Sequence, residues 1–190
     1  YDDIHALKTF GVNGYMSCQE LRAMSPTGFP DYVMAQALTD ERIPFETLRD
    51  TYFSAMFGPG WEEAVAFLER LSSLSDTDYW NNHGPRFQPA LADRYRHITL
   101  LAEEFRTRIP LAQKEVWRKN WEYLDFHCRY TMLLAGALER LSMGDQEEAD
   151  RRFENFCDFI RREEPQRQSR LDVYRVIEVA TKYTGFSMPR

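Results

Sequence analysis

The stretch that decides the fold is LADRYRHITLLAEEFRTRI, residues 91–109. Its apolar residues recur every three or four positions, which places their side chains on one face of an α-helix. They are Leu91, Tyr95, Ile98, Ala102, Phe105 and Ile109. Pro110 follows, and a proline inside a helix removes one backbone hydrogen bond and clashes with the preceding turn. The sequence therefore predicts a long amphipathic helix that stops or kinks at Pro110.

The next segment, up to about Met143, carries two apolar stripes. One stripe consists of Trp117, Trp121, Leu124, Cys128, Ala135 and Leu138, and the other of Tyr123, Tyr130, Leu134 and Leu141. A helix that is apolar on two faces is buried on two sides, so this segment is expected to be a central helix. Shorter stripes in residues 45–56 and 61–71, separated by Pro59-Gly60, predict two helices that pair as an antiparallel hairpin.

Two further helices are predicted from their start signals. Asp145 with Glu148 three residues later is typical of a capping box, with an acid in place of Ser or Thr. Pro165 is expected to end the helix that begins there, and Ser169 with Asp172 repeats the start signal. The apolar residues of the two helices are Phe153, Phe156, Ile160, Val173, Ile177 and Ala180.

The helical periodicity lapses between Ser75 and Pro89, where Trp80 lies among polar and aromatic residues. Aromatic rings and amides suit the faces and hydroxyl groups of sugars, so Trp80 is a candidate substrate-binding residue. The alternative is a surface loop that Trp80 fixes to the helical core. The sequence leaves both interpretations open.

The first thirty residues have a different pattern. Residues 2–10 have helical spacing, Gly11 follows, residues 12–18 resemble a short buried strand, and residues 19–24 resemble a helical turn. This order suits an α/β barrel, and a lone strand needs neighbouring strands for its backbone groups. We therefore expect residues 1–28 to be the last helix-strand unit of an upstream TIM-barrel domain, and residues 29–190 to be a C-terminal α-helical domain. The predicted fold class is mainly α, a bundle of antiparallel helices preceded by this barrel remnant.

Tyr15 and Gln19 share one face of the predicted strand, where they are either ligand contacts or polar residues of a barrel core. Glu20 follows the strand at the end where such barrels place functional loops. Sugar hydrolysis by acid and base needs two facing carboxylates, and no second carboxylate has a comparable position. Glu20 is therefore interpreted as a helix-start residue or a partner of Arg22, and no residue of this chain is predicted to be catalytic.

Composition excludes several classes of function. The formal net charge of −6 opposes binding to nucleic acid and to anionic lipid, and no apolar run is long enough to span a membrane. The three cysteines are far apart and imply no disulfide framework, and the four histidines have no metal-ligand spacing. The sequence predicts no metal site and no cofactor.

Three stretches carry a resemblance to a known family: GVNGYMSCQELRA (11–23), PTGFPDYVM (26–34) and FETLRDTYFSAMFG (45–58). They resemble a bacterial family of unknown function in glycoside-hydrolase-like proteins, in which the end of a TIM barrel runs into a C-terminal helical region. The resemblance covers residues 1 to about 75. It implies carbohydrate processing by a barrel related to α-glucuronidase and hexosaminidase-like hydrolases, with the catalytic acid and base upstream of Tyr1.

The resemblance implies ligand contacts near the last barrel strand for Tyr15, Gln19, Glu20 and Arg22. The expected function is that of a C-terminal helical accessory domain that buttresses the barrel and is not catalytic alone. Carbohydrate would then be a partner through the parent barrel. The alternative is a free-standing helical protein-interaction module.

Overall fold

The computed structural model describes residues 1–12, 14–16, 22 and 25–186. These residues are mainly α-helical, which confirms the predicted mainly α class. The helices are α1 (Asp2–Thr9), α2 (Phe29–Thr39), α3 (Phe45–Phe57), α4 (Trp61–Leu74), α5 (Thr77–Trp80), α6 (Pro89–Arg108), α7 (Glu115–Ser142), α8 (Gln146–Arg167) and α9 (Val173–Thr184). None of the described helices is both long and apolar enough to cross a membrane.

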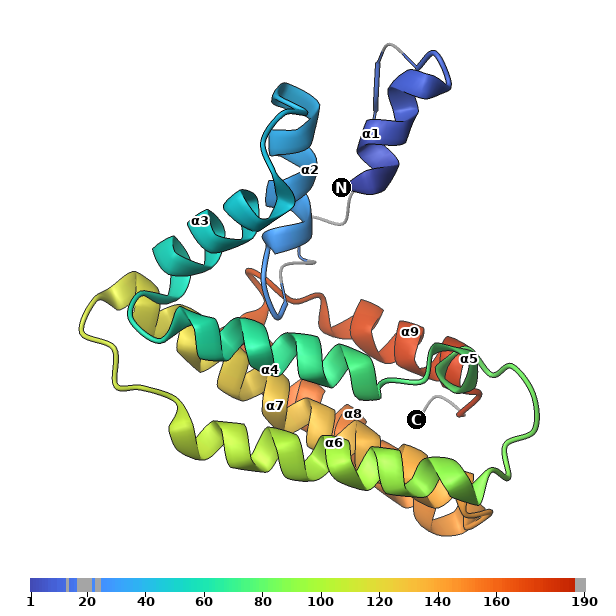
Figure 1. The fold of residues 1–190 in the computed structure, drawn as a ribbon. Helices are drawn as coiled ribbons and strands as arrows, with labels where there is room; N and C mark the ends of the chain where they lie inside the picture. The colour runs from blue at the N-terminus through green and yellow to red at the C-terminus, as the bar shows by residue number, and fades with distance from the viewer. Residues whose placement is uncertain (13, 17–21, 23–24, 187–190) are drawn as a thin grey trace.

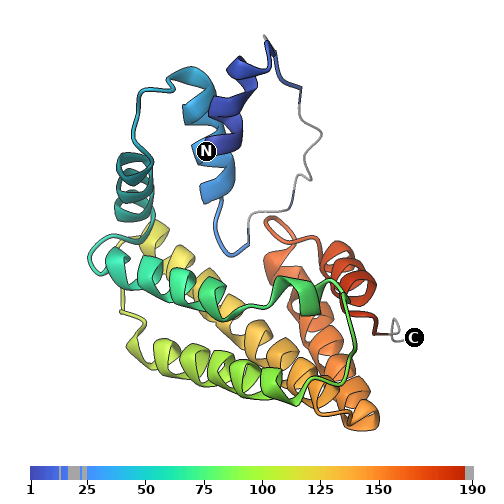
Figure 2. The same ribbon diagram turned by 45° about the vertical axis from the view of Figure 1, so that its right-hand side comes forward.

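The long helix α7 lies between α6 and α8 and packs on both, and α4 packs on α6 (Figure 1). Arg96 of α6 pairs with Glu139 of α7 at 3.0 Å, and Arg106 pairs with Asp125 at 2.6 Å. Residue numbers thus rise along one helix as they fall along the other, so α6 and α7 run in opposite directions. Helices α1 and α2 lie beside each other at one end of the molecule, away from α6 (Figure 2).

Helix α7 is central, as its two apolar stripes predicted, because it packs on α3, α6 and α8. Trp121 is only 2% exposed, and its indole meets the ring of Phe57 edge-on at 5.0 Å between centroids. Phe67 of α4 stacks on Phe105 of α6 at 4.0 Å, and the ring of Phe105 lies 6.3 Å from the indole of Trp121. Large aromatic side chains therefore fill the space between the helices.

The end of α3 is held by side chains of α7. The carbonyl groups of a last helical turn lack partners within their own helix. Here the indole of Trp117 donates to Ala55 O at 3.0 Å, and the indole of Trp121 donates to Phe57 O at 2.9 Å. Between them, the amide of Asn120 donates to Met56 O at 2.9 Å. One face of α7 thus satisfies three consecutive carbonyls of α3.

The predicted start of α8 at Asp145 is confirmed, whereas α9 is capped by Asp172 and not by Ser169. The Asp145 carboxylate accepts a hydrogen bond from the Glu148 N–H at 3.4 Å, and Asp172 accepts one from the Arg175 N–H at 3.0 Å. The predicted end of α8 was wrong, because the helix contains Pro165 and continues to Arg167. A proline removes only its own N–H, and the next turn is still closed by a bond from Gln168 N to Glu164 O at 2.9 Å.

The predicted loop at residues 75–89 contains the short helix α5, because Asp76 caps it by accepting from the Tyr79 N–H at 2.9 Å. The predicted strand at residues 12–18 is not confirmed. Val12 and residues 14–16 are exposed and lie outside any strand. Asn13, Ser17 and Cys18 are outside the described residues.

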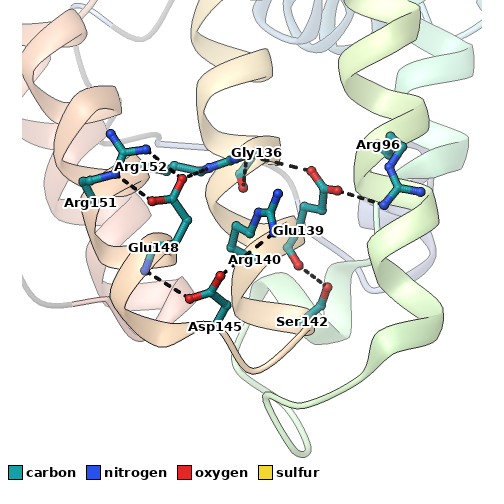
Figure 3. A network of polar contacts seen from close by, with 9 residues as sticks. All are labelled: Arg96, Gly136, Glu139, Arg140, Ser142, Asp145, Glu148, Arg151 and Arg152. Carbon is teal, nitrogen blue, oxygen red and sulfur yellow. Dashed lines mark hydrogen bonds and ion pairs between the residues drawn. The ribbon is translucent and has the colours of Figure 1, made fainter.

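Charged side chains join α6, α7 and α8 at the turn between α7 and α8 (Figure 3). Glu139, whose side chain is 15% exposed, pairs with Arg96 at 3.0 Å and with Arg152 at 3.9 Å. Glu148 accepts hydrogen bonds from Arg151 and Arg152, which lower the pKa of its carboxyl to about 2. This network ties the ends of the three long helices together.

Candidate functional site

A pocket of about 550 Å³ lies where six helices, α4 to α9, meet. Its walls are mainly apolar, and their side chains come from residues far apart in the sequence. Representative wall residues, from α4, α6, α7, α8 and α9 in turn, are Leu71, Ile98, Leu134, Phe156 and Val176. Pockets that bind small molecules have this size and this mainly apolar character, so this is the candidate functional site.

One buried hydroxyl in the wall of the pocket belongs to Tyr95, which is 3% exposed. It has no hydrogen-bond partner among the described residues. Burial raises the pKa of the Tyr95 phenol above its ordinary value of 10.0, so the group stays protonated. Tyr95 thus lines the pocket and carries a hydrogen-bond donor without a partner among the described residues.

A second polar group in the wall is the hydrogen-bonded pair of His127 and Tyr130 on α7. Burial lowers the pKa of His127 to about 4 and raises the pKa of Tyr130 to about 12. Both side chains are consequently uncharged at neutral pH. Their hydrogen bond satisfies one imidazole nitrogen, so the pair is polar without carrying charge.

The charged groups that border the pocket are engaged in ion pairs. Asp76 accepts from the guanidinium of Arg94 at 2.8 Å with one carboxylate oxygen, and from the Tyr79 N–H with the other. Arg175 on α9 donates to Glu178 at 2.6 Å. Among the described residues of the lining, Asp76 is the one carboxylate. The pocket thus lacks the two facing carboxylates that glycoside hydrolysis by acid and base uses.

Trp80 is the predicted binding residue that lies in the wall of this pocket. It also packs against the helical core, so its position agrees with both interpretations made from the sequence. The loop composition singled out Trp80 alone. Tyr95, His127 and Tyr130 were missed as site residues because each lies at a helical core position, and only the packing of six helices brings them together.

The other predicted binding residues lie outside the pocket or outside the described residues. Tyr15 is 50% exposed and does not line the pocket. Gln19 and Glu20 lie outside the described residues, so their expected roles stay predictions. Arg22 donates to the carboxylate of Asp172 at 2.6 Å, and the Asp172 N–H donates to the carbonyl of Arg22 at 3.1 Å.

The part of the chain that the structure describes holds no cluster of side chains suited to a metal ion. Burial raises the pKa of Cys128 to about 12 and that of Cys157 to about 11, so neither thiol is activated as a nucleophile. In comparisons with known proteins, no family model, no curated protein and no solved structure matches this chain.

Proposed function

We propose that this chain is the C-terminal helical accessory domain of a glycoside-hydrolase-like, carbohydrate-active protein, and that it supports a barrel without being catalytic alone. The resemblance in residues 11–23, 26–34 and 45–58 motivates the family. In this proposal, residues 1–28 are the last helix-strand unit of the barrel, and residues 29–190 form antiparallel helices that buttress it.

The proposal rests on a pair of hydrogen bonds between Arg22 and Asp172. The side chain and the carbonyl of Arg22 are both bonded to Asp172, at 2.6 Å and 3.1 Å. Asp172 is also the residue that caps α9. Arg22 is therefore bonded to the start of the last helix, across 150 residues of sequence. In our proposal this contact joins the segment that leads out of the barrel to the helical domain.

Exposed apolar side chains in the opening segment support the same role. Phe10 is 78% exposed and Met16 is 96% exposed, with Val12 and Tyr15 beside them in the sequence. Large apolar groups gathered in one exposed segment are typical of a contact surface. In our proposal they face the barrel. In the alternative, a free-standing interaction module, they face a separate protein.

The chemistry of the pocket favours a supporting role over catalysis by this chain. Its carboxylate, Asp76, caps α5 and pairs with Arg94, so both oxygens are already occupied. Arg22 is likewise engaged by Asp172, which favours a positioning role for Arg22 over direct contact with sugar.

A panel of 4-nitrophenyl glycosides tests the proposal. The 190-residue chain is expected to be folded by circular dichroism and to release no nitrophenol above the buffer rate. Turnover by the isolated chain would overturn the accessory role. For the carbohydrate assignment, the natural polypeptide that contains this chain is assayed on the same panel and by calorimetry with oligosaccharides. An absence of both hydrolysis and binding there would favour the interaction module.

A further inference from the structure

We propose that the pocket lined by helices α4 to α9 is a binding site for an uncharged, mainly apolar small molecule. The molecule carries one hydrogen-bond acceptor for the Tyr95 hydroxyl. This site is separate from the opening segment that carries the proposed accessory function. The inference is therefore independent of whether the chain supports a barrel.

The size and the walls of the pocket set the class of ligand. Protein interiors close most gaps larger than a water molecule, whereas this pocket has a volume of about 550 Å³. Aliphatic and aromatic side chains from several helices line it, including Leu71, Leu138, Phe156 and Val179. Transfer of an apolar molecule from water into such surroundings is favourable in proportion to the apolar area that becomes buried.

The Tyr95 hydroxyl supplies the polar contact. A buried hydroxyl without a partner destabilises a protein, and Tyr95 has none among the described residues although it is 3% exposed. Its ring is held at 5.7 Å from the ring of Tyr79, between centroids. A ligand carbonyl, ether or ring nitrogen that reaches this hydroxyl from the pocket would supply the missing hydrogen-bond partner.

The electrostatics of the walls favour an uncharged ligand. Asp76 is paired with Arg94, Arg175 is bonded to Glu178, and His127 is neutral because burial lowers its pKa to about 4. A charged ligand would lose its hydration on entry and would have to compete with these existing ion pairs. An uncharged ligand has no such cost.

The exposed part of the pocket wall lies near α5 and α9. Ser75, Thr77 and Arg175 are the exposed members of the lining, and they lie at the start of α5 and on α9. Helices α5 and α9 contact each other, and in our proposal a ligand enters beside this contact. Trp80 of α5 lines the same pocket and would report on occupancy through its fluorescence.

Prodan, a neutral two-ring fluorophore with a carbonyl acceptor, is a suitable probe, because its emission shifts to the blue in apolar surroundings. It is titrated into the full chain and into two variants of α9. Val179→Phe places a ring in the pocket and is expected to weaken binding about tenfold or more. Lys182→Phe, on an exposed position of the same helix, is expected to bind prodan like the wild type.

Tyr95→Phe tests the hydrogen bond without filling the pocket. It is expected to weaken prodan binding about 3- to 10-fold and to leave the affinity for 2-propylnaphthalene, which has no acceptor, unchanged. Tyr174→Phe, on the exposed side of α9, is the matched control. No blue shift with folded wild-type protein, or equal binding by the Val179 and Lys182 variants, would overturn the site. Unchanged prodan binding by Tyr95→Phe would overturn the proposed hydrogen bond from the Tyr95 hydroxyl to the ligand.

Discussion

The indole of Trp117 lies directly against Gly58, so that a methyl group on the Gly58 Cα would be 2.3 Å from the ring. Gly58 ends α3 with φ +70° and ψ −151°, a backbone conformation that is essentially restricted to glycine. The same indole donates a hydrogen bond to Ala55 in the last turn of α3. The close approach of α3 and α7 therefore depends on the absence of a side chain at residue 58.

Substitution of Gly58 by Ala is expected to lower the free energy of unfolding by about 3 kcal/mol or more, because both the backbone and the Trp117 contact are strained. Gly60→Ala is the matched control. Gly60 also has a positive φ, +86°, but nothing lies within 4 Å of a Cβ at that position. It is expected to cost about 1 kcal/mol. Urea unfolding measures both, and equal losses would contradict the role of the Trp117 contact.

Asn120 is a second test of the contact between α3 and α7. It is 6% exposed, donates to Met56 O, and accepts a hydrogen bond from Arg170 at 3.0 Å. Asn120→Ala removes the hydrogen bond to the Met56 carbonyl and the acceptor for Arg170, and is expected to lower the unfolding free energy by about 2 kcal/mol. Asn155→Ala, at an exposed position of α8, is expected to change it by less than about 0.5 kcal/mol. Similar losses in both variants would count against this role.

His127 is expected to make stability depend on pH. Its pKa is about 4 in the folded protein, compared with 6.5 for the ordinary group. As the pH falls from 6.5 to about 4, His127 binds a proton in the unfolded chain but not in the folded protein. The free energy of unfolding therefore decreases. His127→Gln is expected to lose this part of the pH dependence in urea unfolding, whereas the exposed variant His97→Gln keeps it. An unchanged profile in His127→Gln would show that the imidazole is not buried in its neutral form.

Glu148 is expected to make stability depend on pH in a lower range, because its pKa is also lowered in the folded protein, here by hydrogen bonds and not by burial. Hydrogen bonds from Arg151 and Arg152 lower its pKa to about 2 from an ordinary 4.5, so its contribution is present above pH 4.5 and is lost as the pH falls toward 2. Glu148→Gln removes this acid-sensitive contribution. Glu147→Gln changes an exposed acid in the same turn and is the control. Acid unfolding followed by circular dichroism should distinguish the two variants, and identical curves would argue against the network in Figure 3.

The long helices could be predicted from the sequence because their apolar spacing and their caps are local signals. Leu91 to Ile109 indicated α6, and Asp145 with Glu148 indicated the start of α8. The end of α8 could not be predicted in the same way. Pro165 lies close to the helix end, and the remaining backbone hydrogen bonds let the helix continue to Arg167.

The pocket could not be predicted because no local pattern encodes it. Tyr95 and His127 lie on different helices, and each has the spacing of an ordinary helical core residue. Trp80 was noticed because it lies where the periodicity fails. The bond between Arg22 and Asp172 is likewise a product of tertiary structure, since 150 residues separate the two partners.

The proposed supporting role depends on the contact that joins Arg22 to the helical body at Asp172. Nuclear magnetic resonance detects such a bond directly, as a scalar coupling between the amide nitrogen of Asp172 and the carbonyl carbon of Arg22. The structure predicts a cross peak between these two nuclei, because the Asp172 N–H donates to Arg22 O at 3.1 Å. Absence of the cross peak, together with an Asp172 amide that exchanges with solvent as fast as an unprotected one, would contradict the claim.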